Sequence, residues 1–502
     1  MAKTLSKRYS GVLAHPTSFP SPYGIGDFGK GAYDFINFLT GAGQSLWQIL
    51  PLGHTGYGDS PYQAFSAFAG QPLLISPDEL IKDGLLYGDD LRDYPHFNPD
   101  HIYYGDVIPA KLRILHRSYE IFKESADLCM LKEFDVFCEH EKDWLDDYAL
   151  FMAGKDAHGG ACWLEWEDDL RDPDEEIKAA WRERLADSIE YYKYIQFIFF
   201  RQWNAIRDYA HVNGIKIVGD IPIFVALDSA DVWANRELFQ LEKDGYPTVV
   251  AGVPPDYFSA TGQLWGNPLY DWDYHKKTHY DWWMRRIKGQ LNMVDYIRVD
   301  HFRGFDEYYA IPYGDKTAEN GVWKKGPGID LFHTVKKELG DANIIAEDLG
   351  YLTESVMKLV KDTGYPGMKV LQFAFDSREE SNYLPHNYPH NCVVYTGTHD
   401  NNTVRGWLDD MCEEDNALAE DYMNNADTPK DERPWEFIRL ALGSVADLAV
   451  IPLQDYLCLG TEARINLPST LGNNWKWRLV PGQVTDEMLE KMCHLNKLFG
   501  RL

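Results

Sequence analysis

Four short apolar runs of the sequence each end in acidic residues. These are Asp220, Asp300, the pair Glu347 and Asp348, and Asp400. Two carboxylates about 5–5.5 Å apart are the equipment of a retaining glycosidase: one attacks the sugar carbon, and the other protonates the leaving oxygen and later deprotonates the acceptor. Aspartate is also a favoured helix N-cap, but capping alone does not account for acidic residues at all four places.

Basic residues stand next to two of these acids. Arg298 precedes Asp300 by two positions, so on a strand both side chains point the same way, and the positive charge favours an ionised Asp300. The pairs Asp300-His301 and His399-Asp400 could also bind a divalent metal. A metal hydrolase more typically shows several histidines at fixed spacing, so we expect no metal here.

The apolar runs have the length and boundaries of strands that are buried on both faces. They span residues 45–52, 72–76, 215–225, 294–301, 343–348, 368–375, 392–398 and 448–457. Helical patterns lie between many of them, as at 187–212 and 353–363. This alternation predicts an α/β fold, a (β/α)8 TIM barrel, with a doubly wound open sheet as the competing interpretation. In a barrel, the four acidic strand ends would meet at the C-terminal face.

A barrel of this kind needs about 250 residues, and the chain has 502. We therefore predict a single catalytic barrel over 1–502 with insertions at its C-terminal rim. Residues 77–214 are predicted as a mainly helical insertion, and residues 226–293 as a loop-rich one. The Gly- and Pro-rich segment 251–267 is a candidate lid, or alternatively a long loop at the rim.

Composition excludes several classes of partner. The net charge is −29, which argues against nucleic acid and against anionic lipid surfaces, while a neutral substrate fits. The basic start is followed by no apolar segment of a signal peptide, and no run approaches the roughly 18 apolar residues of a membrane span. The seven cysteines are scattered without a C-x-x-C pair, so we expect a reducing, cytoplasmic setting. Nothing in the sequence points to an oligomeric state.

One stretch matches a nucleotide-binding motif but lacks the structural context that the motif requires. Residues 24–29 read G-I-G-D-F-G, which matches G-x-G-x-x-G. The motif needs a preceding strand, and here the preceding residues are P-S-P-Y, so a turn-rich loop is the better interpretation. No P-loop and no serine nucleophile elbow is present. We expect no cofactor.

Longer stretches resemble a known family almost from end to end. They read SFPSPYGIGD at 18–27, GYGDSPY at 56–62, GDIPI at 219–223, GVPPDYFSATGQLWGNP at 252–268, RVDHFRG at 298–304, AEDLG at 346–350, TGTHDN at 396–401 and RINLP at 464–468. The combined pattern resembles the amylomaltases, also called 4-α-glucanotransferases or disproportionating enzymes. The resemblance implies an amylase-like barrel without the separate C-terminal β domain. The last predicted strand ends at 457, which leaves too little chain for such a domain.

The resemblance also implies roles for single residues. Asp300 is similar to the family's nucleophile, Glu347 to its general acid/base, and Asp400 to its transition-state-stabilising acid. Four further residues fall where the family binds the glucose about to be transferred: Tyr57, Asp220, Arg298 and His399. Three fall on the acceptor side: Gln263, Trp265 and Asn466. Tyr257 is a further aromatic candidate there.

The implied activity is transfer of α-1,4-glucan segments to the 4-hydroxyl of glucose or another glucan, by a double displacement through a glycosyl-enzyme. The implied partners are α-1,4-glucans and maltooligosaccharides. Two alternatives stay open: an α-amylase-type retaining hydrolase, which would use the same three acids, and a non-catalytic glucan-binding protein.

Overall fold

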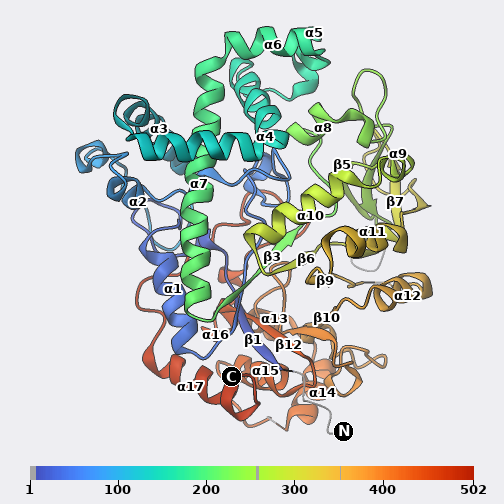
Figure 1. Cartoon of the computed structure of the whole chain (residues 1–502). Coiled ribbons are helices and arrows are strands. Elements are labelled where there is room, and N and C mark those ends of the chain that lie inside the picture. The colour runs from blue at the N-terminus through green and yellow to red at the C-terminus, as the bar shows by residue number, and fades with distance from the viewer. Residues whose placement is uncertain (1–6, 256–258, 351, 425) are drawn as a thin grey trace.

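Eight parallel strands form the centre of the molecule (Figure 1). The computed structural model describes residues 7–255, 259–350, 352–424 and 426–502. The sheet runs in the order β10-β11-β12-β1-β2-β3-β6-β9. Its strands are β1 (Tyr9–Leu13), β2 (Leu46–Gln48), β3 (Lys216–Ile221), β6 (Tyr296–Val299), β9 (Ile344–Ala346), β10 (Gly367–Val370), β11 (Cys392–Tyr395) and β12 (Leu448–Pro452).

Two hydrogen bonds join the outer strands β9 and β10. Ala346 N donates to Pro366 O at 2.9 Å, and Met368 N donates to the carboxylate of Asp348 at 2.7 Å. The sheet is therefore closed into a (β/α)8 barrel, as the sequence predicts. Asp348, which follows Glu347 at a strand end, serves this closure.

Side chains alternate between the two faces of the barrel strands. Those that point into the barrel form one buried apolar cluster, which includes Leu13, Leu46, Val218, Ile345, Val393 and Val450. Those that point outward join the large core beneath the helices, as Val12 and Ile217 do. Burial on both faces explains why the strands read as continuous apolar runs.

Seven of the eight predicted strand runs contain a barrel strand, and the run 72–76 does not. It forms a 3-10 turn at Pro72–Leu74, in which Leu73 N donates to the Gln71 side chain. The eighth strand is β1, which the sequence did not reveal because Ser10 and Gly11 interrupt its apolar pattern. Gly11 is required there, since a Cβ would lie 2.5 Å from the Cβ of Leu46.

A helical segment separates β2 from β3; in Figure 1 much of it stands above the barrel, and its last helix runs down beside the barrel. It contains α2 (Pro77–Lys82), α3 (Tyr104–Ser125), α4 (Leu128–Ala157), α5 (Asp168–Arg171), α6 (Glu175–Arg184) and α7 (Ala186–Val212). Helix α7 matches the predicted 187–212 pattern and packs against α4, for example through Phe134 and Phe197 with ring centroids 5.7 Å apart. It ends at Val212, and Gly214, which follows the C-cap Asn213, has a φ of +77° that suits the end of a helix; β3 follows at once.

The segment between β3 and β6 holds more regular structure than the predicted loops. It contains α8 (Ala230–Ala234), β4 (Val249–Val253), β5 (Gln263–Pro268), α9 (Trp272–Lys277) and α10 (Asp281–Met293). Strands β4 and β5 form an antiparallel sheet with β7 (Glu307–Pro312) and β8 (Val322–Lys325), in the order β5-β4-β7-β8. Half of this sheet lies beyond β6 in sequence, so local patterns did not predict it.

The remaining α-helices lie around the barrel. They are α1 (Lys30–Gly41), α11 (Ile329–Leu339), α12 (Glu354–Thr363), α13 (Val404–Asp410), α14 (Glu413–Met423), α15 (Arg433–Gly443), α16 (Leu453–Tyr456) and α17 (Asp486–Leu498). Helix α12 follows the predicted 353–363 pattern, with Thr353 as its N-cap. Residues 453–502, all of which the structure describes, contain no strand. Within the described chain, no helix combines the length and apolar character needed to cross a bilayer.

Candidate active site

The acidic strand ends meet on one side of the barrel, as parallel strands require. Asp220 on β3 pairs in register with Arg298 on β6. Val299 pairs with Ala346 on β9, and the next residues along the two strands are Asp300 and Glu347. Neighbouring strands lie about 4.7–4.9 Å apart. This register brings Asp300 and Glu347 to adjacent strand ends.

Arg298 connects two of the acids. Its Nη1 donates to both carboxylate oxygens of Asp220, at 2.8 and 2.7 Å, and its Nη2 donates to Asp300 Oδ1 at 2.9 Å. Arg298 and Asp220 are buried, whereas the Asp300 side chain is 29% exposed. Burial disfavours the charge on Arg298, but Asp220 and Asp300 outweigh it and keep its pKa well above the usual value. Asp300 therefore lies beside a permanent cation and keeps one face accessible.

Glu347 is held through backbone amides. His301 N donates to its Oε2 at 2.6 Å, and Leu349 N donates to its Oε1 at 2.9 Å. Burial, and next the charge of Asp300, raise the pKa of Glu347 to about 7, against the opposing effects of Arg298 and of the two amides. At neutral pH this carboxyl group can both give and take a proton.

Asp400 follows β11 and is fixed from the segment after α16. Asn466 Nδ2 donates to Asp400 Oδ1 at 2.6 Å, and Arg464 donates to its backbone oxygen at 2.6 Å. His399 Nε2 lies 3.3 Å from the same carboxylate oxygen. The Asp400 side chain is 41% exposed. Asn466, expected on the acceptor side, thus contacts an acid that the sequence placed at the reacting centre.

Tyr62 is a site residue that the sequence reasoning did not single out. Its hydroxyl donates to Asp220 Oδ2 at 2.8 Å, and its ring stacks on His399 with centroids 5.2 Å apart. Tyr62, His399 and Trp475 form an aromatic group, in which the ring centroid of Trp475 lies 5.9 Å from that of Tyr62 and 6.0 Å from that of His399. Tyr62 is the last residue of the GYGDSPY stretch at 56–62. The expected residue of that stretch, Tyr57, lies in a 3-10 turn at Tyr57–Asp59, and the structure does not describe its side chain.

Gln263 and Trp265 lie on β5, beside the catalytic strands. Trp265 Nε1 donates to Gln263 Oε1 at 3.1 Å, and the Trp265 ring meets the His301 ring edge-on with centroids 4.8 Å apart. The candidate lid 251–267 spans the end of β4, the connection after it and most of β5. Residues 256–258 of that connection, including Tyr257, lie outside the described residues.

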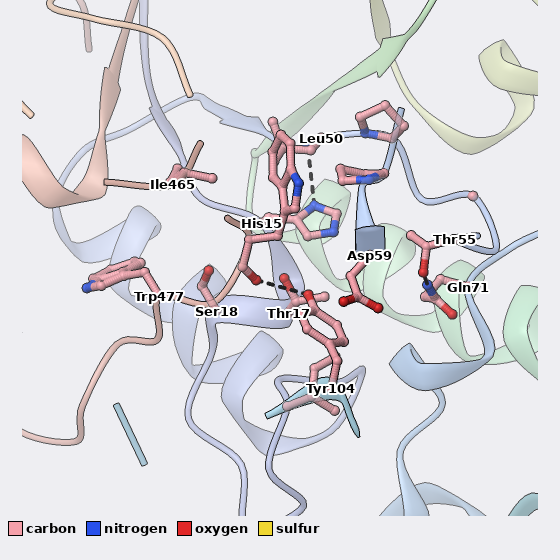
Figure 2. A pocket seen from close by; sticks show the side chains of 15 residues that line it. His15, Thr17, Ser18, Leu50, Thr55, Asp59, Gln71, Tyr104, Ile465 and Trp477 are labelled. Atoms are coloured by element: carbon pink, nitrogen blue, oxygen red, sulfur yellow. Dashed lines mark hydrogen bonds between the residues drawn. The ribbon is translucent and has the colours of Figure 1, made fainter. Parts of the chain in front are cut away.

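A small cavity lies next to the aromatic group (Figure 2). Its volume is about 30 Å³, and its lining includes His15, Asp59, Tyr104 and Trp475. Tyr104 donates to the backbone oxygen of Trp475 at 2.9 Å. Burial, with a further effect of His399, lowers the pKa of His15 to about 3, so this imidazole is neutral. In the described chain, no group of three or more His, Cys, Asp or Glu side chains is placed to hold a metal ion.

Comparison with known proteins agrees with this geometry. Residues 14–483 match the family described as 4-alpha-glucanotransferase. The 4-alpha-glucanotransferases of Synechocystis and of Clostridium butyricum are each 48% identical to the chain, over 99% and 97% of it and 99% of either relative. The solved amylomaltase from Streptococcus agalactiae, in complex with acarbose, superposes with a TM-score of 0.95 at 40% identity and covers 99% of this chain and all of its own. A family match over most of the length, near-half identity and a shared fold lead to one conclusion: the chain belongs to the 4-alpha-glucanotransferase family.

Proposed function

We propose that this protein is a 4-alpha-glucanotransferase that moves segments of α-1,4-glucan to the 4-hydroxyl of glucose or another glucan. The observation that carries the proposal is the pairing of two unlike carboxyl groups at adjacent strand ends. Asp300 accepts a hydrogen bond from Arg298, and the pKa of Glu347 is raised to about 7. A double displacement needs one carboxylate that stays ionised and one carboxyl group that exchanges a proton.

In the first half-reaction, Glu347 donates its proton to the glycosidic oxygen while Asp300 attacks the anomeric carbon. The bond from carbon to the leaving oxygen breaks, and a β-linked glycosyl ester forms on Asp300. Arg298 orients the attacking carboxylate through its hydrogen bond to Oδ1. Asp400, held by Asn466, binds sugar hydroxyls as positive charge develops on the ring.

The second half-reaction uses the change in charge at Asp300. Its carboxylate charge raises the pKa of Glu347, and that charge disappears when Asp300 becomes an ester. The pKa of Glu347 therefore falls in the intermediate, and the group becomes the base that removes the proton of the acceptor 4-hydroxyl. Attack by that oxygen restores the α-1,4 bond and frees Asp300. Two inversions give retention.

Transfer requires that a sugar reach the intermediate ahead of water. Trp265 contacts His301, which follows the end of β6, and donates to Gln263. We propose that both residues face the acceptor, where an indole ring can stack on a sugar face. We propose that the β4–β5 segment 251–267 closes over the acceptor and shields the ester. An α-amylase-type hydrolase is the second candidate, because the same three acids would serve it.

The segments 77–214 and 226–293 would act as insertions on one catalytic barrel rather than as separate functional units. Glucans and maltooligosaccharides would be the substrates. All seven cysteines are free, which supports a cytoplasmic setting.

Incubation with maltotriose separates the candidates. A transferase produces glucose together with a ladder of longer oligosaccharides and no net gain in reducing ends. A steady gain in reducing ends would favour the hydrolase instead. Binding of maltooligosaccharide without any product would favour the non-catalytic glucan-binding protein.

A further inference from the structure

His301 has an unusual backbone conformation beside the two catalytic carboxyl groups. Its φ and ψ are +50° and +49°, the left-handed region that side-chain-bearing residues seldom adopt. In this conformation its amide points at Glu347 and donates to Oε2 at 2.6 Å. The nucleophile Asp300 directly precedes it. A strained residue at such a place points to a function for the strain.

The residues after His301 are anchored, so the strain cannot relax through them. Phe302 N donates to Glu347 O at 3.1 Å, and Gly304 N donates to His301 O at 2.9 Å. Phe302 and Phe305 are fully buried in the core. If φ of residue 301 left the left-handed region, the peptide between Asp300 and residue 301 would rotate instead. That rotation would turn its N–H away from Glu347.

The His301 ring is confined on two sides. It meets the Trp265 ring edge-on at 4.8 Å, and an added Cβ at Gly304 would lie 3.3 Å from its Cδ2. Burial, and also Arg303, lower the pKa of His301 to about 4 against the effect of Asp300. The ring is therefore neutral at neutral pH, and it acts through its shape.

We propose that His301 is a positioning residue that connects the acceptor-side Trp265 to Glu347. The contact between the two rings holds the left-handed backbone, and that backbone aims the amide at Glu347 Oε2. A sugar bound on the acceptor side would then affect Glu347, the proton-transferring group, through the His301 side chain. This inference rests on the proposed function and concerns how its acid/base is tuned.

The charged groups around Glu347 determine in which direction its pKa moves when the His301 amide no longer donates to it. Asp300 raises its pKa, while Arg298 and the amides of His301 and Leu349 lower it. Tyr383 also faces Glu347 and, with a pKa raised to about 12 by burial and nearby carboxylates, stays neutral. Loss of the His301 amide removes a donor to the ionised form, so the pKa of Glu347 rises. The alkaline limb of activity, where the acid loses its proton, then moves to higher pH.

Three variants test the connection through the pH profile of kcat/KM for maltotriose disproportionation. His301→Val disfavours the left-handed backbone, His301→Asn tolerates it without the imidazole, and Trp265→Ala removes the ring contact while residue 301 stays unchanged. We expect His301→Val to move the alkaline limb upward by about one pH unit. Trp265→Ala should move it in the same direction by less, and His301→Asn should leave it in place.

Failure of this inference differs from failure of the proposed function. A wild-type protein that forms no oligosaccharide ladder contradicts the function itself. If the wild type forms the ladder but the alkaline limbs of all variants coincide, only the role of His301 is overturned. The same holds if the alkaline limb of His301→Asn moves as far as that of His301→Val. If the Val variant does not fold, Trp265→Ala against His301→Asn decides, and an unmoved limb in Trp265→Ala overturns the proposal.

Discussion

Arg298 donates to Asp300 Oδ1 at 2.9 Å through one nitrogen while its other terminal nitrogen is held by both oxygens of Asp220. The buried Asp220 thus fixes the guanidinium, and the guanidinium fixes the carboxylate of Asp300, the proposed nucleophile. Only the planar fork of arginine can serve two carboxylates in this way. The Asp300 carboxylate is therefore oriented before any substrate arrives.

The first prediction concerns the contacts of the Arg298 guanidinium with Asp220 and Asp300. Arg298→Lys keeps the positive charge but cannot contact Asp220 and Asp300 with the same geometry, so we expect kcat to fall by about 100-fold or more. Kinetics of maltotriose disproportionation measure the change. Arg478→Lys is the matched control, because Arg478 is equally buried but donates to the backbone oxygens of Phe19 and Ser21. Equal activity in the two lysine variants would contradict the assigned role.

The second prediction concerns the proton on Glu347. A general acid must be protonated, and burial and Asp300 raise the pKa of Glu347 to about 7. The value of kcat/KM should therefore decline as the pH rises through about 7. The carboxyl resonance of labelled Glu347 in an Asp300→Asn variant should titrate at lower pH than in the wild type, because the like charge is gone. An unchanged or higher titration would show that Asp300 does not tune Glu347.

The third prediction separates the two contacts of Tyr62. Tyr62→Phe removes the hydroxyl that donates to Asp220 but keeps the ring on His399. We expect kcat/KM to fall by about 10-fold in Phe, and further in Tyr62→Ala, where the stacking is also lost. If the Phe variant matches the wild type, the hydroxyl has no part in holding Asp220.

The fourth prediction concerns stability. Asp455, on α16, is fully buried and accepts hydrogen bonds from Thr396 Oγ1 and Val404 N, at 2.6 and 2.7 Å. Burial raises its pKa from 3.8 to about 6. For an acid with a raised folded pKa, the favourable contribution is complete below the unfolded pKa and is lost as the pH rises through about 6.

An Asn at 455 carries no charge at any pH. Relative to the wild type, Asp455→Asn should therefore gain up to about 3 kcal/mol of unfolding free energy between pH 4 and pH 8. Chemical denaturation at the two pH values measures the difference, and the wild-type curves serve as the reference. A difference that is constant with pH would contradict the raised pKa.

Much of the site could be predicted from the sequence because it lies on strands. Alternation along β6 placed Arg298 and Asp300 on the same side, and the structure shows their contact. The apolar runs located all the barrel strands except β1, whose small polar residues hide it. The 72–76 run misled because burial alone does not distinguish a strand from the 3-10 turn that Pro72 begins.

Contacts between distant segments were beyond local patterns. The bond from Tyr62 to Asp220 joins residues 158 positions apart, and that from Asn466 to Asp400 joins residues 66 apart. The β4–β7 pairing crosses an entire barrel strand. Nothing in the sequence around His301 indicates its left-handed backbone, because Glu347 and Trp265, which His301 contacts, are distant from it in sequence.

The central claim, that Asp300 forms a glycosyl ester while Glu347 transfers the proton, can be tested by trapping that ester. In Glu347→Gln, an α-maltotriosyl fluoride donor needs no acid to lose fluoride, but the intermediate lacks its base. Mass spectrometry of the quenched and digested protein should then show one maltotriosyl adduct, on the peptide that contains Asp300. The adduct should be absent when Asp300→Asn is added. An adduct on another residue, or one that persists without the Asp300 carboxylate, would contradict the account.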